Sequence, residues 1–483
     1  MKSEASLKEN TAKGLLWSGF GNGIQQLLNL VFGIFLARLL NADDYGMVGM
    51  LTVFSAMAGV LQEGGFVSAL NRRHNVTDND YNSVFWLGLV VSVAIYVTFF
   101  FCAPLIARFY GVDELVPLSR FIFLGFLISS FGTVPGAYMF RNMMVRQRSI
   151  IAIVSLLLSG TVGVAMAACG YAYWGIATQT IVLTSTTVAM MYYYTRWHPK
   201  LHFDLKPIRE MIGFSSKLIV TNAFTVVNNN IFPVLLGRLY TPYEVGNFTQ
   251  AYKWNTMGSS LISNMLNSIA QPVFSKTETD TARQKNIFRK LLRFTAFISF
   301  PTMLTLSLVA EEFIVILLTE KWIESAHILR LLCVAGAFAP LSALFSNLLI
   351  SRGQSSVFMR CTIALFSLLL LALFFAAPHG IHIMVTIYVC FNTGWLLVWH
   401  HFVRREIGLT LMETARDIAP YAGLTIVLIA VAQFAASPVH NIYASFALKV
   451  AVVAVGYCLL LWLLRSVIFR EAILFITKKK ITL

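Results

Sequence analysis

Two stretches of the chain carry amide and hydroxyl side chains at a spacing that suits hydrogen bonding from one face of a helix. They are Asn22, Gln25 or Gln26, and Asn29 in the first stretch, and Asn222, Thr225 and Asn229 in the second. Residues three, four and seven positions apart share one helical face. Inside a membrane such groups either hydrogen-bond a neighbouring helix or line a polar cavity. A stripe on both helices favours the cavity.

The two stretches match one another as copies. Polar residues and a glycine of the first copy meet the same or a similar residue 200 positions later, without a gap. The matched pairs are Asn22 and Asn222, Asn29 and Asn229, Arg38 and Arg238, Asp44 and Glu244, and Gly46 and Gly246. Hydrophobic letters alone could match by chance. Amides, an arginine, an acid and a glycine in one register indicate an internal duplication.

The composition places these stretches in a membrane protein. The chain is 57% hydrophobic and 12% charged, with a mean hydropathy of +0.71. A soluble protein of this length would carry about twice that share of charged residues. Apolar runs of roughly 20 residues, which span the bilayer core, follow one another almost end to end. The sequence therefore predicts an all-α polytopic membrane protein. The net charge of +15 indicates no nucleic-acid partner, because the basic residues are spread through short loops.

The apolar runs predict fourteen membrane spans. They are residues 15–37, 46–69, 84–107, 116–138, 150–171, 174–195, 211–237, 246–271, 294–318, 327–350, 358–378, 381–402, 417–436 and 443–466. With the amino terminus in the cytoplasm, 28 of the 37 basic residues fall on the cytoplasmic side. This positive-inside distribution predicts that both termini are cytoplasmic.

Six of these spans separate one copy from the other, so both copies enter the membrane in the same direction. We therefore expect two parallel six-helix lobes, related by a pseudo-two-fold axis along the membrane normal. Spans 13 and 14 have no counterpart in the repeat. The predicted domains are an N-terminal lobe at 1–196, a cytoplasmic linker at 197–209, a C-terminal lobe at 210–403, and two additional helices with a basic tail at 404–483.

Charged residues within or beside the spans are the next candidates. An ionisable group at depth costs at least about 2.5 kcal/mol, so it usually faces a cavity or a partner. Glu63 is the one acid assigned to a span, and it is the candidate for proton or sodium coupling. Lys217 either snorkels to the interface or faces the cavity, whereas Lys253 lies too deep to snorkel easily. Arg38 and Arg238 either pair with acids of the outer turns or contact the substrate.

Signs of catalytic chemistry are missing from the sequence. It has no nucleotide-binding loop and no long soluble segment, and its six cysteines lie far apart in apolar runs. No two histidines share a helix face near a carboxylate. We therefore expect no enzyme activity, no metal site and no cofactor, with proton or sodium coupling left open.

Several motifs resemble a known family. The turn at residues 37–46, Ala-Arg-Leu-Leu-Asn-Ala-Asp-Asp-Tyr-Gly, resembles the first periplasmic turn of bacterial polysaccharide flippases in the multidrug/oligosaccharidyl-lipid/polysaccharide (MOP) superfamily. Further stretches fit its colanic-acid-exporter-like branch, namely residues 13–18, 64–70, 80–86 and 320–322. The chain departs from the pattern at Asn41-Ala42, where Thr-Pro or Gly-Pro is usual, but the second copy keeps Thr241-Pro242.

This resemblance implies a V-shaped, two-lobed transporter of the bacterial inner membrane. It would move an undecaprenyl-pyrophosphate-linked oligosaccharide, such as an O-antigen, capsule or exopolysaccharide repeat unit, to the periplasmic leaflet by alternating access. Membrane lipids and assembly proteins such as a polysaccharide polymerase are the other expected partners. The candidate cavity residues are Asn22, Gln25, Asn29, Asn222, Asn229, Lys253, Lys217, Arg38 and Arg238.

Three other functions are alternatives to this one. A multidrug or ion-coupled antiporter of the same superfamily usually has twelve spans, so the additional pair argues against it. A lipid II flippase also has fourteen spans and stays open. A membrane polysaccharide polymerase would favour a large periplasmic loop with catalytic Arg or His, and no predicted outer loop is long enough.

Overall fold

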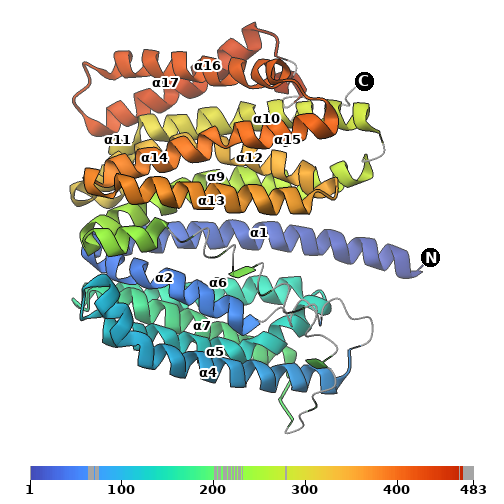
Figure 1. Ribbon diagram of the computed structural model, residues 1–483, viewed down its shortest axis with the longest axis vertical. Coiled ribbons are helices and arrows are strands. Elements are labelled where there is room, and N and C mark those ends of the chain that lie inside the picture. Colours follow the sequence, from blue (N-terminus) through green and yellow to red (C-terminus); the bar gives the residue numbers. More distant parts are fainter. Residues whose placement is uncertain are drawn as a thin grey trace. The chain divides into compact units, whose positions relative to one another are not determined.

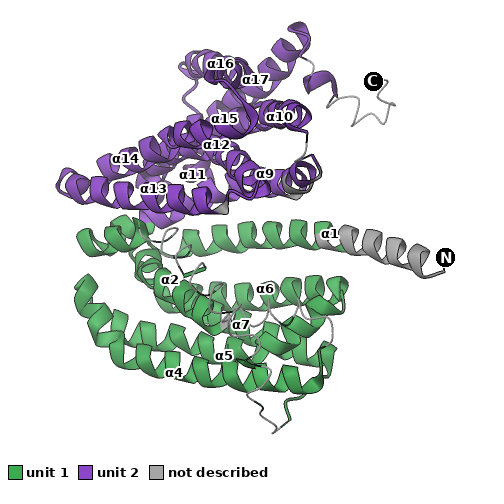
Figure 2. Ribbon diagram, turned by 45° about the vertical axis from the view of Figure 1, so that its right-hand side comes forward, with its two compact units in different colours: residues 1–246 green, residues 247–483 purple. Residues whose placement is uncertain are grey.

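The computed structural model describes most of the chain as helix. The residues described are 2–63, 76–200, 232–277, 280–466 and 468–471, together with residues 70, 204, 208, 209, 215, 219, 222, 223, 226 and 230. Within these residues the elements are helices, and no strand occurs (Figure 1). The predicted all-α class is therefore confirmed. The chain divides into two compact units, residues 1–246 and 247–483 (Figure 2).

Unit 1 contains the first copy of the repeat and the outer turn of the second. Its helices are α1 (Lys2–Leu39), α2 (Ala42–Glu63), α4 (Asp78–Tyr110), α5 (Leu115–Arg141), α6 (Val145–Ala168), α7 (Tyr173–Thr195) and the first turn of α9 (Pro242–Lys276). Within the unit, α1 packs against α6, α6 against α7, and α5 against both α7 and α4. These contacts bury one side of each apolar helix and leave the other side for lipid.

Unit 2 contains the rest of α9 and all later helices. They are α10 (Thr281–Leu308), α11 (Ala310–Leu318), α12 (Ile323–Ser351), α13 (Ser355–Ala376), α14 (Ile381–Gly394), α15 (Leu396–Ile407), α16 (Leu411–Ala436) and α17 (Ile442–Leu463), with short 3-10 turns η1 (Glu320–Trp322) and η2 (Ala377–His379). α12 lies at the centre, because it contacts α10, α11, α14 and α15. The fully buried rings of Trp322, Phe288 and Phe345 contribute to this core.

The described residues contain eleven helices that are long and apolar enough to cross a membrane. Three predicted spans are not among them. The span at 174–195 coincides with α7, the span at 246–271 lies within α9, and the span at 211–237 lies mostly outside the described residues. α9 is 35 residues long, so it is absent from the eleven helices because of its polar side chains and not because of its length. The count of fourteen stays a prediction.

Two predicted spans are each built from two helices. The span at 294–318 breaks at Val309, which separates α10 from α11. The span at 381–402 changes helix at Trp395, directly after Gly394. Hydropathy reports how apolar a run is and is insensitive to a local break in the backbone, so neither break was predicted.

The start of the predicted linker is hydrogen-bonded to α4. The indole of Trp86 donates a hydrogen bond to the carbonyl of Lys200 at 2.9 Å, and the Lys200 N–H donates to Asn82 Oδ1 at 2.8 Å. The Asp204 N–H donates to the hydroxyl of Ser83 at 3.3 Å. The helix residues in these three bonds, Asn82, Ser83 and Trp86, lie in the first turns of α4. The predicted domain boundaries themselves stay a prediction.

Charged side chains join the additional helix α16 to α10 within unit 2. Arg289 of α10 donates two hydrogen bonds to the carboxylate of Asp417, at 2.7 and 3.1 Å. Lys285 forms an ion pair with Glu413 at 2.8 Å. The two hydrogen bonds between Arg289 and Asp417 fix the orientation of the two side chains as well as their distance. The start of α16 is therefore held in a defined register against α10.

Candidate functional site

The amide stripe on α1 lies on a face that is accessible along only part of its length. Asn22, Asn29 and Leu36 are seven residues apart and therefore share one face. Asn22 and Asn29 are exposed and Gln25 is half-buried, whereas Leu36 and Leu40 are only 4% and 3% exposed. The polar, N-terminal part of this face is thus open, and its apolar, C-terminal part is closed.

The second copy repeats this pattern where it is described. Asn222 is exposed, and Leu236, the counterpart of Leu36, is fully buried. Asn229 and Lys217 lie outside the described residues. The equivalent positions of both copies therefore agree in exposure as well as in residue type, which supports a shared role for the two faces.

The two outer turns meet one another through their glycines. A Cβ atom added to Gly46 would lie 1.8 Å from the carbonyl oxygen of Pro242, and one added to Gly246 would lie 1.8 Å from that of Ala42. The contact is reciprocal, since positions 46 and 42 match positions 246 and 242. Reciprocal contacts are what a two-fold axis between the turns produces. The predicted two-fold relation therefore holds at this point of unit 1, and only glycine permits the backbones to approach this closely.

The acids of these turns cap the helices that follow. The carboxylate of Asp44 accepts a hydrogen bond from the Asn41 N–H at 2.9 Å, and that of Glu244 accepts one from the Thr241 N–H at 3.0 Å. Each acid thus satisfies a backbone donor at the start of α2 or α9. The exposed guanidinium of Arg238 lies over the ring of Phe109 at 5.6 Å. Arg38 is exposed as well. Substrate contact for the two arginines stays a prediction.

Lys253 belongs to a longer polar stripe on α9. The stripe consists of residues spaced three or four apart, namely Lys253, Thr256, Ser260, Asn264 and Asn267. Lys253, Asn264 and Asn267 are exposed. The Asn267 side-chain oxygen accepts a hydrogen bond from Asn347 of α12 at 2.7 Å. Sequence reasoning selected only Lys253, although the 3–4 spacing of the other four was readable from the sequence.

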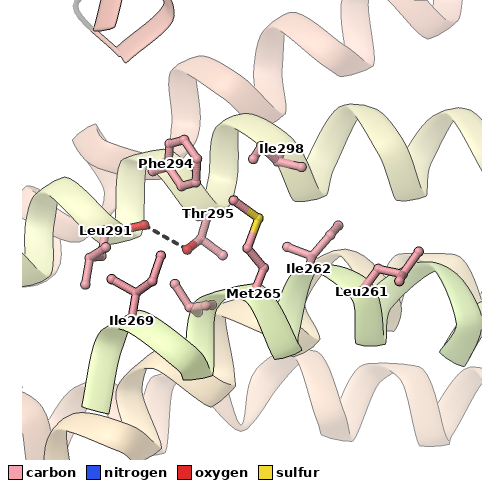
Figure 3. Close-up of a pocket in the computed structure, with 9 residues that line it drawn as sticks. Leu261, Ile262, Met265, Ile269, Leu291, Phe294, Thr295 and Ile298 are labelled. Atoms are coloured by element: carbon pink, nitrogen blue, oxygen red, sulfur yellow. Dashed lines mark hydrogen bonds between the residues drawn. The ribbon is translucent and has the colours of Figure 1, made fainter. Parts of the chain in front are cut away.

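An apolar groove lies between α9 and α10 (Figure 3). It has a volume of about 200 Å³ and is lined by Leu261, Ile262, Met265, Leu266, Ile269, Leu291, Phe294, Thr295 and Ile298. The only hydroxyl in this lining, on Thr295, donates to the carbonyl of Leu291 at 2.7 Å. Its hydrogen-bonding capacity is therefore directed into the helix, and the groove presents hydrocarbon to whatever enters it.

The stripe and the groove occupy opposite sides of α9. At 100° per residue, the stripe residues lie within about 60° of Lys253, whereas the five α9 residues of the groove lie about 80° to 220° around the helix from it. One helix therefore presents an exposed cation with amides on one side and an apolar groove on the other. The polar side suits a polar ligand group, and the groove suits hydrocarbon.

Glu63, the acid identified in the sequence, is the last residue of α2. Its side chain lies outside the part of the chain that the structure describes. The statement that Glu63 is the one acid within a span was wrong, because the predicted span at 294–318 contains Glu311 and Glu312. Glu312 is buried, and its carboxylate accepts hydrogen bonds from the Lys449 ammonium and from the Ser445 hydroxyl, the latter at 3.0 Å.

The fold of this chain is similar to the folds of solved membrane transporters. The fold is similar to that of "Lipid II flippase MurJ, inward closed conformation", with a TM-score of 0.75, 14% identity, and coverage of 95% of this chain and 100% of that one. It is also similar to an inward-facing multidrug resistance MATE family transporter of the MOP superfamily, with a TM-score of 0.65, 18% identity, and coverage of 80% and 94%. The chain is thus a multi-pass helical membrane protein whose fold is similar to the folds of these two transporters.

Sequence comparison then gives the family. Residues 35–327 match the family described as "Polysaccharide biosynthesis protein", and the chain belongs to that family. It is 24% identical to the lipopolysaccharide biosynthesis protein WzxC of Escherichia coli K12 over 358 residues, which is 73% of this chain and 72% of that protein. The resemblance seen in the outer turn and the other motifs is therefore confirmed.

Proposed function

We propose that this protein is a flippase that moves an undecaprenyl-pyrophosphate-linked oligosaccharide from the cytoplasmic to the periplasmic leaflet of the bacterial inner membrane by alternating access. The observation that carries the proposal is the exposed polar stripe of Lys253, Asn264 and Asn267 on one side of α9. A groove of about 200 Å³ with apolar walls lies on the opposite side of the same helix. The stripe suits the sugar and pyrophosphate of a lipid-linked oligosaccharide, and the groove suits hydrocarbon.

The polar part of the cargo needs compensation for the water it loses. An amide can hydrogen-bond sugar hydroxyls, and in a low-dielectric surrounding a lysine ammonium attracts a pyrophosphate far more strongly than in water. The lipid tail has the opposite requirement, because it loses nothing by contact with Leu261, Met265 and Phe294. Sugar and tail can therefore cross together without leaving an unsolvated charge in the hydrocarbon core.

The duplicated helices supply the second support. Asn22 and Asn29 on α1, and Asn222 in the second copy, are exposed on faces whose outer ends close at Leu36 and Leu236. Polar side chains exposed on one part of each face, with apolar side chains buried on the other part, suit one state of an alternating-access transporter. Asn229, Lys217, Arg38 and Arg238 complete the proposed cargo surface.

Relatives support a glycan as the transported group. WzxC is named for lipopolysaccharide biosynthesis, and a relative from Rhizobium meliloti is named a succinoglycan biosynthesis transport protein. Both names refer to polysaccharides, which favours a glycan over a small cationic drug. The proposed location, with both termini cytoplasmic, follows from the 28 basic residues assigned to that side.

The proposal is tested with the purified protein in vesicles that contain a fluorescent undecaprenyl-pyrophosphate oligosaccharide. A membrane-impermeant reagent that modifies the sugar reports how much substrate has reached the outer leaflet. We expect the protein to raise the accessible fraction from about half to nearly all, with Lys253→Glu failing to do so. Equal rates for the wild type and Lys253→Glu, or transport of cationic dyes in place of the glycolipid, would overturn the proposal.

Coupling to an ion gradient is a separate part of the proposal. We assign the coupling role to Glu63, because an acid within a membrane span is expensive unless it has a function or a partner. In the same vesicles, Glu63→Gln should abolish the response of the rate to a proton or sodium gradient and leave the amount of folded protein unchanged. A mutant that still responds to the gradient would remove Glu63 from this role.

A further inference from the structure

A small cavity in unit 2 is lined by two arginines at the ends of membrane-crossing helices. It has a volume of about 340 Å³, and its lining comes from the end of α12, the start of α13 and the end of α15. The lining residues are Leu349, Gln354, Val357, Arg360, Cys361, Phe402, Arg405 and Glu406. We infer that this cavity binds the phosphodiester headgroup of an anionic phospholipid from the cytoplasmic leaflet.

Three helix ends come together at the cavity. α12 ends at Ser351, and the chain reverses at Gly353, whose φ of +72° is left-handed, before α13 begins at Ser355. The rings of Phe358 in α13 and Trp399 in α15 stack at 5.7 Å, which holds α15 beside α13. Since these helices cross the membrane, their common end lies at the level of lipid headgroups.

The two arginines are available to an anion. Arg360 and Arg405 are exposed, and Arg360 uses one N–H in a 3.2 Å hydrogen bond to the carbonyl of Ser356. Among the described residues, neither guanidinium lies within ion-pair distance of a carboxylate. By contrast, Arg289 of the same unit is paired to Asp417. A planar guanidinium suits a phosphate oxygen pair, and basic pockets between membrane helices are known binding sites for anionic headgroups.

The rest of the lining narrows the class of ligand. Glu406 also lines the cavity, so the titratable side chains there have a net charge of +1. That balance suits a phosphodiester with one negative charge better than a phosphate monoester with nearly two. Leu349, Val357 and Phe402 give the cavity an apolar wall, which the glycerol and the first acyl carbons of a phospholipid can contact. A soluble phosphate has no such part.

The test measures lipid binding to the full-length purified chain by native mass spectrometry. The probe is phosphatidylglycerol, and phosphatidylcholine serves as the lipid control because its headgroup has no net charge. Arg360→Gln and Arg405→Gln should each weaken phosphatidylglycerol binding roughly tenfold, the effect of one lost charge-assisted hydrogen bond. Arg404→Gln is the matched control, since Arg404 is the exposed neighbour of Arg405 and does not line the cavity; it should bind like the wild type.

A variant that is expected to tighten lipid binding distinguishes the loss of the binding site from misfolding. Glu406→Gln removes the one negative charge of the lining and should tighten phosphatidylglycerol binding, which a damaged protein would not do. Unchanged binding in both arginine variants would overturn the inference. So would displacement of the lipid by inorganic phosphate at equal concentration, because the site would then be one for soluble anions. These outcomes concern binding alone and leave the proposed transport function unaffected.

Discussion

The ammonium of Lys449 donates a hydrogen bond to the carboxylate of Glu312 in the interior of unit 2. Lys449 lies two turns into α17 and Glu312 lies in the first turn of α11. Both side chains are almost fully covered, at 10% and 12% exposed, and Ser445 donates a further hydrogen bond to the same oxygen at 3.0 Å. α17 is therefore joined to α11 by a desolvated ion pair.

Breaking this pair from one side should destabilise the protein strongly. Lys449→Met leaves the Glu312 carboxylate buried without its counter-charge, which costs about 3–5 kcal/mol in comparable cases. The double variant Glu312→Gln/Lys449→Met removes both charges and should recover much of that loss. Thermal unfolding of the purified protein in detergent measures the effect. Glu311→Gln is the control, because its side chain is 49% exposed. If Lys449→Met unfolds at the wild-type temperature, the pair contributes nothing to stability.

The glycine contact between the outer turns predicts that alanine destabilises the protein at Gly46 and Gly246 but not at Gly59. Gly46→Ala and Gly246→Ala each place a methyl group 1.8 Å from a backbone oxygen, and overpacking of this kind typically costs about 1–3 kcal/mol. Gly59→Ala lies on the same helix as Gly46 and meets nothing within 4 Å. It should be neutral or slightly stabilising, because alanine favours helix by up to about 1 kcal/mol. Equal unfolding temperatures for Gly46→Ala and Gly59→Ala would contradict the close approach.

Lys253 should tolerate a conservative change only. Lys253→Arg keeps the positive charge and should retain most glycan transport, whereas Lys253→Ala and Lys253→Glu should lose it because the pyrophosphate then lacks its counter-charge. The measurement is periplasmic glycan output in a strain that lacks its own flippase, with the amount of protein in the membrane measured in parallel. Full output from Lys253→Glu would exclude the charge role.

The amides of the two copies should act together if they line one surface. Replacement of Asn29 and Asn229 by Ala at the same time should reduce glycan output by more than the two single effects combined. The same assay applies. A loss of output that follows the loss of membrane-inserted protein would assign the amides to helix packing instead.

The charge distribution predicts the topology. Reporter fusions after Arg148, Arg209 and Arg405 should all score as cytoplasmic, because each residue lies in a segment that belongs to the basic-rich side. A periplasmic score at any one of these positions would overturn the span count between it and the amino terminus.

Much of the helical framework is a local property, and the sequence determined it alone. Apolar length and composition are read within about 20 residues, so eleven of the predicted spans coincide with apolar helices of the structure. The duplication at a spacing of 200 residues predicted a two-fold relation between the copies, and the reciprocal contact of Gly46 and Gly246 with the opposite turns agrees with it. Residue type and spacing also identified Asn22, Asn29 and Asn222, whose side chains are exposed.

Other features depend on which distant residues pack together, and only the tertiary structure decided them. Lys449 and its counter-charge Glu312 lie 137 positions apart, and nothing in the sequence near either residue indicates that they form a pair. The groove between α9 and α10 exists because two helices leave their apolar faces apart, which neither hydropathy profile encodes. The contact of Arg238 with Phe109 arose in the same way. The capping role of Glu244 is by contrast local, because Thr241 and Glu244 form a Thr-x-x-Glu capping box. A side chain's partner is set by three-dimensional packing, whereas a helix is set by its own residues.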